Sequence, residues 1–345
     1  MYIERSNFLP GLHVLRGLAA ASTVLFHLHL MQPVFRVNYL HFVNTLGAGV
    51  TLFFMISCFS LFHSTLPKLD RNNWLAGFVL RRLFRIYPLF LFMLAVHLAL
   101  HFIIYHKIYS PGEVLLNLLL MYQFYPGAHE SIIWAGWTIG VEVTFYCLFP
   151  LLLATSRKFS FWLILFLVTM ALSHEIPAMI SSLNLNNSYA YMSFPRQLFV
   201  FIGGGVVYLL AGRYPDKTLF GLAALGASIV ILYFTGTLTA KVLFIGCMIY
   251  AFHKSPLLFN PFTRFLGEAS YTIYLVHPVV VAGLKPWLTR LYGLGLPDDL
   301  SFIISFAIVF SIVCVISLII NKFIEIPVYR FGVKIAERVE SAPLR

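Results

Sequence analysis

The stretch Leu9-Pro-Gly-Leu-His-Val-Leu-Arg-Gly-Leu-Ala-Ala-Ala-Ser-Thr-Val-Leu-Phe-His-Leu-His-Leu-Met31 decides the fold of this chain. It is almost entirely apolar and as long as the roughly 20 residues that a helix needs to cross a bilayer. Arg16 and His27 interrupt the apolar pattern. Ionisable groups inside a span are unfavourable and are retained mainly for function. The stretch therefore predicts a first membrane span that carries functional side chains.

Further apolar runs of similar length follow along the chain. They predict an all-α polytopic membrane protein with about ten transmembrane helices, in one domain over residues 1–345. The predicted spans are 9–31, 43–66, 83–104, 137–154, 160–174, 194–212, 218–234, 238–252, 269–284 and 300–323. Residues 113–122 predict a short re-entrant or interfacial helix, with an eleventh span as the alternative. Residues 325–340 alternate apolar and basic side chains and predict a C-terminal amphipathic helix on the membrane surface.

The composition agrees with this class. The chain is 60% hydrophobic and only 11% charged, whereas soluble domains are about 25% charged. A soluble enzyme, a disordered protein and a secreted disulfide scaffold are therefore excluded. The net charge of +11 would suggest nucleic acid in a soluble protein. In a membrane protein it indicates basic cytoplasmic loops and an anionic ligand, so membrane lipid is an expected partner and nucleic acid is not.

The distribution of the 24 Lys and Arg residues predicts the orientation. With a cytoplasmic N-terminus and ten alternating spans, 17 of them face the cytoplasm, 6 face outward and Arg16 lies within the first span. Cytoplasmic loops are the ones enriched in Lys and Arg. We therefore expect a multi-pass protein of the inner (cytoplasmic) membrane with both termini in the cytoplasm.

Two pairs of residues within the spans are candidates for chemistry. Arg16 and His27 lie eleven positions apart, about 16.5 Å along a helix and close to one face. Tyr274 and His277 are three positions apart, so one helical face presents a phenol and an imidazole. The alternatives are an Arg16 that extends to the membrane surface and histidines that only bond neighbouring helices.

A buried carboxylate and a basic cluster complete the candidate set. Glu142 follows Trp137 in a span that enters from outside, at a depth like that of His27. A carboxylate beside an imidazole fixes its tautomer and raises its basicity, so we expect Glu142 to orient His27 as a general base. Arg81, Arg82 and Arg85 form a cytoplasmic basic mouth, and guanidinium groups suit phosphate. The alternative for this mouth is lipid head-group anchoring. No histidine spacing predicts a metal site.

Six motifs in this order resemble the acyltransferase 3 family of membrane acyltransferases. They cover nearly the whole chain: Arg16-Gly-Leu-Ala19 with His27; Gly49 through Phe53-Phe54 to Ser57-Cys-Phe59; Arg82-Leu-Phe-Arg85-Ile-Tyr-Pro88; Trp137 through Glu142 to Phe145-Tyr146; Leu266-Gly267 with Ser270-Tyr271, Tyr274-Leu275 and His277; and Glu325-Ile-Pro327. His13 stands where the family often has Asp, and Cys58 where it usually has Gly.

The resemblance implies acyl transfer, usually O-acetylation, from cytoplasmic acyl-CoA, most often acetyl-CoA, to a hydroxyl of an envelope polysaccharide such as lipopolysaccharide or of a lipid-linked glycan. It implies that His27 is catalytic with Arg16, and that Arg82 and Arg85 lie at the donor side. Arg81 and Arg16 are further expected donor contacts. Expected contacts to substrate or oxyanion are Trp137, Ser270, Tyr271, Tyr274 and His277.

Several alternatives stay open at this level. His27 can act as a base or form a covalent acyl-histidine. A transporter or flippase for glycans or lipids would also need buried polar groups, although such proteins commonly carry internal repeats, which the sequence lacks. A non-catalytic membrane sensor of the same fold is the third reading. A homo-oligomer is also an open alternative to a single chain.

Overall fold

A computed structural model describes residues 8–31, 47–215 and 218–342 of the chain. The regular structure in these residues is helical. The chain divides into two compact units, Met1–Ser57 with Val207–Leu318, and Cys58–Val206 with Ile319–Arg345. The prediction of one domain over residues 1–345 stays a prediction. The two chain ends and the first residues of the predicted span 43–66 lie outside the described residues.

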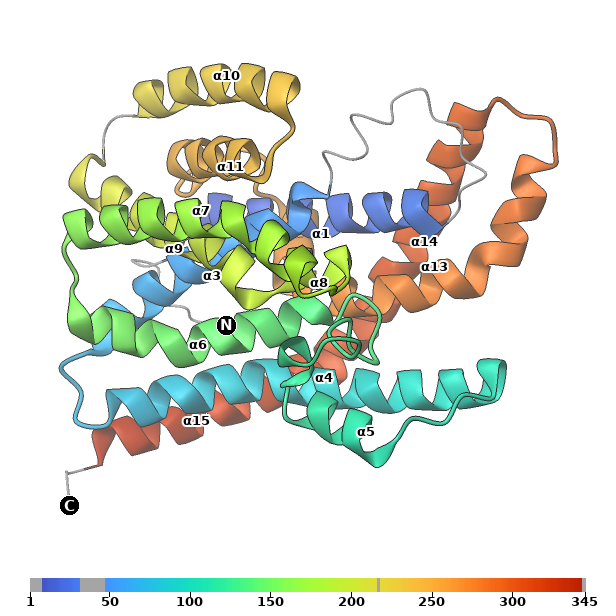
Figure 1. Ribbon diagram of the computed structural model, residues 1–345, viewed down its shortest axis with the longest axis horizontal. Helices are drawn as coiled ribbons and strands as arrows, with labels where there is room; N and C mark the ends of the chain where they lie inside the picture. The colour runs from blue at the N-terminus through green and yellow to red at the C-terminus, as the bar shows by residue number, and fades with distance from the viewer. Residues whose placement is uncertain (1–7, 32–46, 216–217, 343–345) are drawn as a thin grey trace. The chain divides into compact units, whose positions relative to one another are not determined.

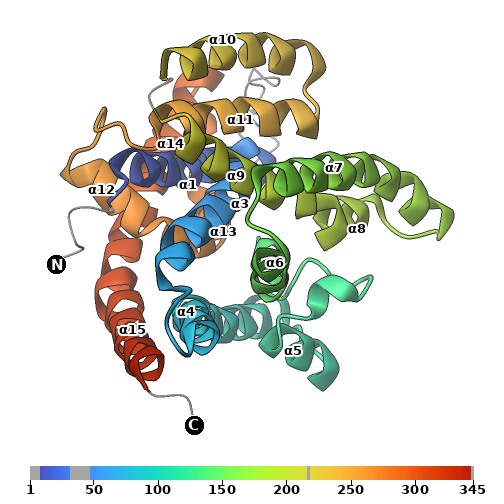
Figure 2. The same cartoon turned by 90° about the vertical axis from the view of Figure 1, so that its left-hand side faces the viewer.

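The first unit carries the predicted His27 site. Its helices are α1 (Pro10–Met31), the first half of α3 (Ala48–Thr65), α10 (Thr218–Thr235), α11 (Leu238–Phe252), α12 (Pro261–Glu268), α13 (Ser270–Tyr292) and most of α14 (Asp298–Ile320). Helices α10 and α11 lie side by side, and α1 packs on α12 and α13 (Figures 1 and 2). The site is thus built on the contact between α1 and the α12–α13 pair.

Glycines bring α1 and α12 into near-backbone contact. A Cβ at Gly17 would lie 2.8 Å from Cβ of Leu266, and one at Gly267 would clash with the backbone carbonyl of His13. Side chains at these positions would push the helices apart. Helix α12 is bent by 77° from α13, and at the bend the hydroxyl of Ser270 donates to the carbonyl of Gly267 at 3.0 Å. The predicted span 269–284 is therefore the start of a longer helix that follows a sharp bend.

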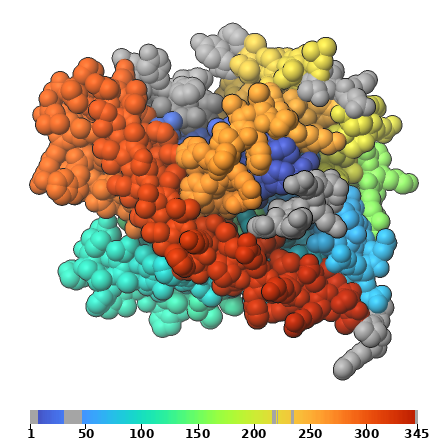
Figure 3. All heavy atoms as spheres, turned by 180° about the vertical axis from the view of Figure 1, so that it is seen from behind, coloured from blue at the N-terminus to red at the C-terminus, as the bar shows by residue number. Residues whose placement is uncertain are grey.

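The second unit is built around α4. It contains η2 (Leu66–Lys68), α4 (Trp74–Tyr105), α5 (Pro111–Leu118), η3 (Tyr122–Phe124), α6 (Trp137–Thr155), α7 (Phe159–Ser182), α8 (Asn187–Met192), most of α9 (Phe194–Arg213), the π-helical turn η4 (Asn321–Glu325) and α15 (Ile326–Ser341). Helix α15 runs along α4 (Figures 1 and 2), and its outer side lies at the surface, in red in Figure 3.

The contact of α15 with α4 depends on small residues. Gly332 and Ala336 are buried on α15, and a Cβ at Gly332 would clash with Cβ of Phe84 on α4. Lys334, Glu337 and Arg338 of the same helix are exposed. The helix predicted over 325–340 therefore exists with nearly the predicted bounds, with one side buried against α4 and the other exposed. Its place on a membrane surface stays a prediction.

Each of the ten predicted spans contains a helix. Within the described residues, seven helices are long and apolar enough to cross a membrane, or eight if the bent pair of α12 and α13 counts as one span. Two shorter apolar helices, Gly221–Leu232 and Leu238–Phe252, coincide with the predicted spans 218–234 and 238–252. A helical, polytopic membrane protein is thus supported, and the count of about ten spans stays a prediction.

The observed helix bounds differ from the predicted ones where a helix continues through charged or polar residues that interrupt its apolar run. Helix α4 begins at Trp74 rather than at 83, so Arg81 and Arg82, which precede the predicted span, also lie inside the helix. Helix α7 continues past 174 to Ser182. Helix α5 has 8 residues, about 12 Å of length, which is too short for an eleventh span.

Helix α5 begins at a capping box. The Ser110 side chain accepts from the Glu113 N–H at 3.2 Å, and the Glu113 carboxylate accepts from the Ser110 backbone N–H at 2.9 Å. These backbone and hydroxyl donors of Ser110 lower the pKa of Glu113. A charged cap at this end is typical of a helix that meets water. The interfacial and re-entrant readings of 113–122 both remain.

We expect Gly205→Ala to destabilise the protein. A Cβ at 205 would lie 2.8 Å from ring atoms of Phe62 and Trp162, which are both fully buried. Overpacking of this kind costs about 1–3 kcal/mol, so the melting temperature of the detergent-solubilised protein should fall by several degrees. Gly212→Ala on the same helix is the control, because a Cβ there meets nothing within 4 Å. Equal melting temperatures for the two variants would contradict the close packing at Gly205.

Candidate functional site

Two histidines from distant parts of the chain meet inside the first unit. Nε2 of His277 lies 3.2 Å from Nδ1 of His27, and their ring centres are 4.9 Å apart. His277 is completely buried, whereas His27 is half-buried. Sequence analysis singles out both residues but does not pair them. The packing of α1 against α13 brings them together.

The hydrogen-bond partners define the tautomers of this pair. Nδ1 of His277 lies 3.3 Å from the carbonyl oxygen of Ile273, which only accepts, so this nitrogen carries the proton. Nε2 of a neutral His277 is then an acceptor for the Nδ1–H of His27. That same N–H also points to the carbonyl oxygen of Thr23 at 3.0 Å. A neutral His27 therefore has its unprotonated nitrogen at Nε2, where it can take up a proton.

Tyr274 lies on the same face of α13 as His277, as the spacing predicts. Its ring centre is 5.7 Å from that of His277 and 5.8 Å from that of Phe53 on α3, and the side chain is buried. Ser270 is buried and its hydroxyl donates within the α12–α13 bend. Tyr271 is half-buried at the start of α13. Contacts of Ser270, Tyr271 and Tyr274 with substrate or oxyanion stay predictions.

Arg16 lies on α1 three turns before His27. The residue is half-buried, and the intervening helix is continuous from Pro10 to Met31. The two side chains are therefore separated by about 16.5 Å along one rigid element. This separation allows a long, thin substrate to contact both.

Glu142 bonds to a tyrosine of its own helix. The Tyr146 hydroxyl donates to Oε1 of Glu142 at 2.6 Å, in the second unit. The predicted pairing of Glu142 with His27 stays a prediction, because these residues belong to different units. Trp137 is buried at the start of α6, with its ring centre 5.7 Å from that of Tyr191.

Arg82 and Arg85 are surrounded by aromatic rings of the second unit. Nη2 of Arg82 donates to the Ser64 hydroxyl at 3.2 Å, and its guanidinium carbon lies 5.5 Å from the centre of the Tyr146 ring. The guanidinium carbon of Arg85 lies 5.8 Å from the centre of the Tyr329 ring. Cation–π contacts of this kind stabilise guanidinium groups in apolar surroundings.

Acidic groups of the second unit also act on Arg85. It interacts electrostatically with Glu325 and Glu142. Glu325 in turn accepts a hydrogen bond from the amide of Asn321 at 2.9 Å, in the π-helical turn. The half-buried Arg85 thus belongs to a polar network with the buried Asn321 and Glu325 rather than to an open basic loop.

Arg81, the third predicted donor contact, takes part in a structural ion pair. Its Nη1 lies 2.5 Å from Oε1 of Glu340 on α15, outside hydrogen-bond geometry. Oε2 of Glu340 accepts from Arg71 at 2.6 Å. Arg81 is 6% exposed and Glu340 3%. This carboxylate therefore neutralises the buried guanidinium and connects α15 to α4.

Sequence reasoning missed four residues that shape these sites: Thr23, Ser64, Tyr146 as the partner of Glu142, and Glu340. Thr23 precedes His27 by four positions, which places its carbonyl beside the ring, so helical spacing was a usable signal. The i, i+4 spacing of Glu142 and Tyr146 was another. Nothing in the sequence pairs Arg81 with Glu340. Among the described residues, no group of three His, Cys, Asp or Glu side chains could hold a metal ion.

Comparison with known proteins gives three findings. A family model described as "Acyltransferase domain" matches residues 9–322. A protein of Acidianus two-tailed virus, ORF330, whose name gives it as a proposed acetyltransferase, is 26% identical in a 297-residue alignment that covers 79% of this chain and 83% of the viral protein. No solved structure gives a significant match.

We expect Glu340→Gln to destabilise the second unit strongly. The change leaves the buried Arg81 guanidinium without a counter-charge, and breaking a buried ion pair costs about 3–5 kcal/mol. Glu337→Gln, an exposed change on the same helix, is the control and should leave the melting temperature within about a degree. The double change Arg81→Met with Glu340→Leu should recover most of the loss. Equal melting temperatures for Glu340→Gln and Glu337→Gln would refute a stabilising ion pair.

Proposed function

Because the chain belongs to the acyltransferase 3 family, we propose that it is a membrane O-acyltransferase that uses acyl-CoA, with acetyl-CoA as the first candidate. The acceptor in this proposal is a hydroxyl of an extracytoplasmic polysaccharide, such as lipopolysaccharide, or of a lipid-linked glycan. The family and the viral relative support acyl transfer. The long apolar helices support a membrane location.

One observation carries the proposed chemistry: the contact between His27 and His277 at 3.2 Å. An O-acyltransferase needs a base for the acceptor hydroxyl, and a positioned imidazole is the most frequent one. His277 and the Thr23 carbonyl both engage the Nδ1 side of His27. Nε2 is then the nitrogen left to act, much as a carboxylate fixes the tautomer of a histidine base elsewhere.

In the proposed reaction His27 carries one proton from the acceptor hydroxyl to the thiolate that leaves. Nε2 of His27 removes the proton from the acceptor hydroxyl, whose oxygen attacks the carbonyl carbon of the thioester. The tetrahedral intermediate collapses with cleavage of the carbon–sulfur bond, and the thiolate of CoA takes the proton from His27. Hydrogen-bond donors stabilise the oxyanion of such intermediates. Tyr274 is the candidate beside the pair, whereas Arg16 lies about 16.5 Å along α1 from His27 and can reach the oxyanion only through its long side chain. A covalent acyl-histidine is the alternative course.

The orientation predicted from the basic residues determines from which side of the membrane each proposed substrate approaches the site. Acyl-CoA is polyanionic and cytoplasmic, so its nucleotide belongs with the 17 basic residues predicted to face that side. Arg82 and Arg85 remain predicted donor contacts, whereas the ion pair of Arg81 with Glu340 favours a structural role for Arg81. The acceptor hydroxyl would reach His27 from the outer side.

The direct test is formation of an ester by the purified protein. The protein in phosphatidylcholine nanodiscs is incubated with radiolabelled acetyl-CoA and purified cell-envelope glycans, and base-labile label on the glycan is measured. We expect acetyl ester in the presence of the protein. Binding of glycan without any ester would instead favour the transporter or sensor reading. Mass spectrometry of surface glycans from a deletion strain, which should lose one acetyl mass, then identifies the acceptor.

We expect His27→Ala to abolish acyl transfer while the protein stays folded in the membrane. Loss of a general base lowers the rate by about 10²–10⁴. His29→Ala, two positions along α1, is the control, because His29 points to another side of the helix and packs against Phe302. The measurement is initial rate of ester formation at matched amounts of folded protein. Full activity in His27→Ala would remove this residue from the mechanism.

We expect His277→Leu to lower kcat by at least about 10-fold, with a smaller loss in His277→Gln. Both side chains have similar size, but only the Gln carbonyl can accept the Nδ1–H of His27. Rates of the two variants are compared at saturating acetyl-CoA. An equal loss of rate in both variants would show that His277 acts through packing and not as the hydrogen-bond acceptor of the His27 Nδ1–H.

A further inference from the structure

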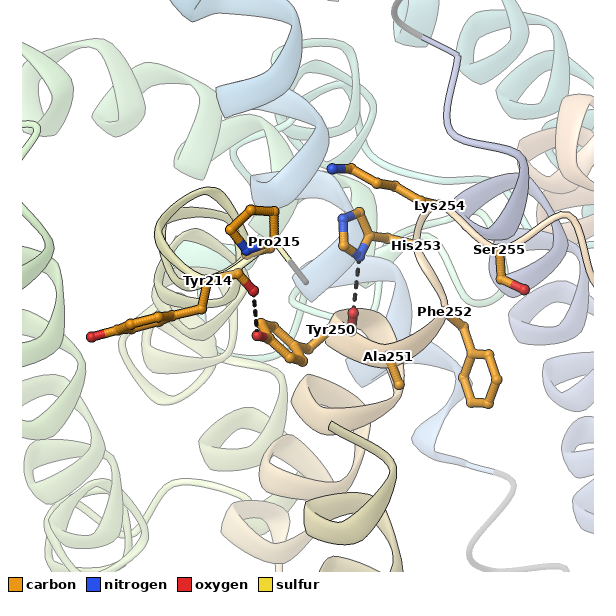
Figure 4. Close-up of a pocket in the computed structure, with 9 residues that line it drawn as sticks. Tyr214, Pro215, Tyr250, Ala251, Phe252, His253, Lys254 and Ser255 are labelled. Atoms are coloured by element: carbon orange, nitrogen blue, oxygen red, sulfur yellow. Dashed lines mark hydrogen bonds between the residues drawn. The ribbon is translucent and has the colours of Figure 1, made fainter. Parts of the chain in front are cut away.

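A cavity of about 310 Å³ lies in the first unit, where α9 and α11 end. Its walls come from Ala211, Tyr214 and Pro215 on one side and from Tyr250 to Ser255 on the other (Figure 4). The volume is at the lower end of the range for small-molecule sites. None of the residues in its wall belongs to the set singled out by sequence motifs.

Two backbone carbonyls in the cavity wall accept hydrogen bonds from side chains of the same wall. The Tyr250 hydroxyl donates to the carbonyl oxygen of Tyr214 at 2.6 Å, and the His253 imidazole bonds the carbonyl oxygen of Tyr250 at 3.0 Å. Both of these carbonyls, at helix ends that carry partial negative charge, therefore already have a hydrogen-bond donor from the chain itself.

The remaining polar side chains favour an anionic ligand. Lys254 is exposed, and in Figure 4 its ammonium group extends over His253 toward Pro215. The hydroxyl oxygen of Ser255 accepts from the Leu257 N–H at 3.2 Å, which leaves its O–H to donate. A further cation, Arg213, lies with its guanidinium carbon 5.7 Å from the Tyr214 ring centre. Ammonium, guanidinium and hydroxyl donors are the groups that bind phosphate oxygens.

The cavity wall is joined directly to α1. The Leu12 N–H donates to the carbonyl oxygen of His253 at 3.2 Å, and a Cβ at Gly11 would clash with the carbonyl of Phe252. From Leu12, the helix rises about 6 Å to Arg16 and about 22 Å to His27. The cavity therefore lies at the end of α1 where Arg16 is found, and the imidazole pair lies further along the same helix.

We propose that this cavity binds the phosphate-bearing nucleotide end of the acyl-CoA donor, whose pantetheine arm then extends along α1 past Arg16 to the His27–His277 pair. The inference rests on the proposed function. CoA joins a diphosphate and a separate phosphomonoester to its thioester through a long flexible arm, so its charge and its reactive carbon need separate sites. The cavity and the imidazole pair are such sites within one unit, on the side where Arg213 and Lys254 are predicted to face the cytoplasm.

The test compares Lys254→Gln with Lys158→Gln. Both lysines are exposed and predicted cytoplasmic, and Lys158 precedes α7 in the other unit. The affinity for CoA is measured by calorimetry on protein in phosphatidylcholine nanodiscs, and KM and kcat are measured with acetyl-CoA and with S-acetylpantetheine, which lacks phosphate. We expect Lys254→Gln to weaken CoA binding and raise KM for acetyl-CoA at least about 5-fold, with kcat and all S-acetylpantetheine constants unchanged. Lys158→Gln should resemble wild type.

Three results would overturn the assignment. Wild-type affinity for CoA in Lys254→Gln would exclude a nucleotide site in the cavity, and an equal change with both donors would indicate general damage. Phosphatidylglycerol is added to the nanodiscs to test whether the cavity binds the phosphate of a lipid headgroup instead of the phosphates of CoA. If it binds in a Lys254-dependent way while KM for acetyl-CoA does not change, the cavity holds a lipid headgroup. A wild-type protein that neither binds CoA nor forms ester would refute the proposed function itself.

Discussion

The organisation of this protein follows from one constraint: apolar surroundings leave a polar group no partner except another part of the chain. Backbone groups meet this requirement by forming helices. The few ionisable side chains meet it in pairs, His27 with His277, Glu142 with Tyr146, and Arg81 with Glu340. The first and third of these pairs join different helices that packing must hold in register, whereas Glu142 and Tyr146 share one helix.

The pairs differ in whether they leave a basic atom available for proton transfer. Arg81 and Glu340 neutralise each other and fasten α15 to α4. The two imidazoles carry no formal charge as neutral tautomers, and their contact uses one nitrogen of His27 while the other stays basic. A neutral pair is less costly to bury than an ion, and it can still accept a proton when substrate arrives. This difference explains why the histidines, rather than the more highly charged groups, are the better candidates for acid–base chemistry.

The sequence was sufficient to predict helices at all ten apolar runs, because periodic hydrophobicity and length are local properties. It was also sufficient to select His27, His277 and Tyr274, since ionisable groups in apolar runs are conspicuous. It could not predict that α4 starts at Trp74, because Arg81, Arg82 and Arg85 interrupt the apolar run after its first two turns. Nor could it pair Arg81 with Glu340, which are separated by more than 250 positions, or reveal the cavity beside Lys254, which forms only where the ends of α9 and α11 meet.

The π-helical turn Asn321–Glu325 has a consequence for how this chain can vary in length. A π-helical turn contains one residue more than an α-helical turn. The wider turn absorbs that residue, so its removal within Asn321–Glu325 would restore a regular helix and leave α15 facing α4 as before. A deletion inside α15 would instead rotate all later residues by about 100° and turn Glu340 away from Arg81. A change of one residue in length should therefore be tolerated in the π-helical turn far better than within Ile326–Ser341.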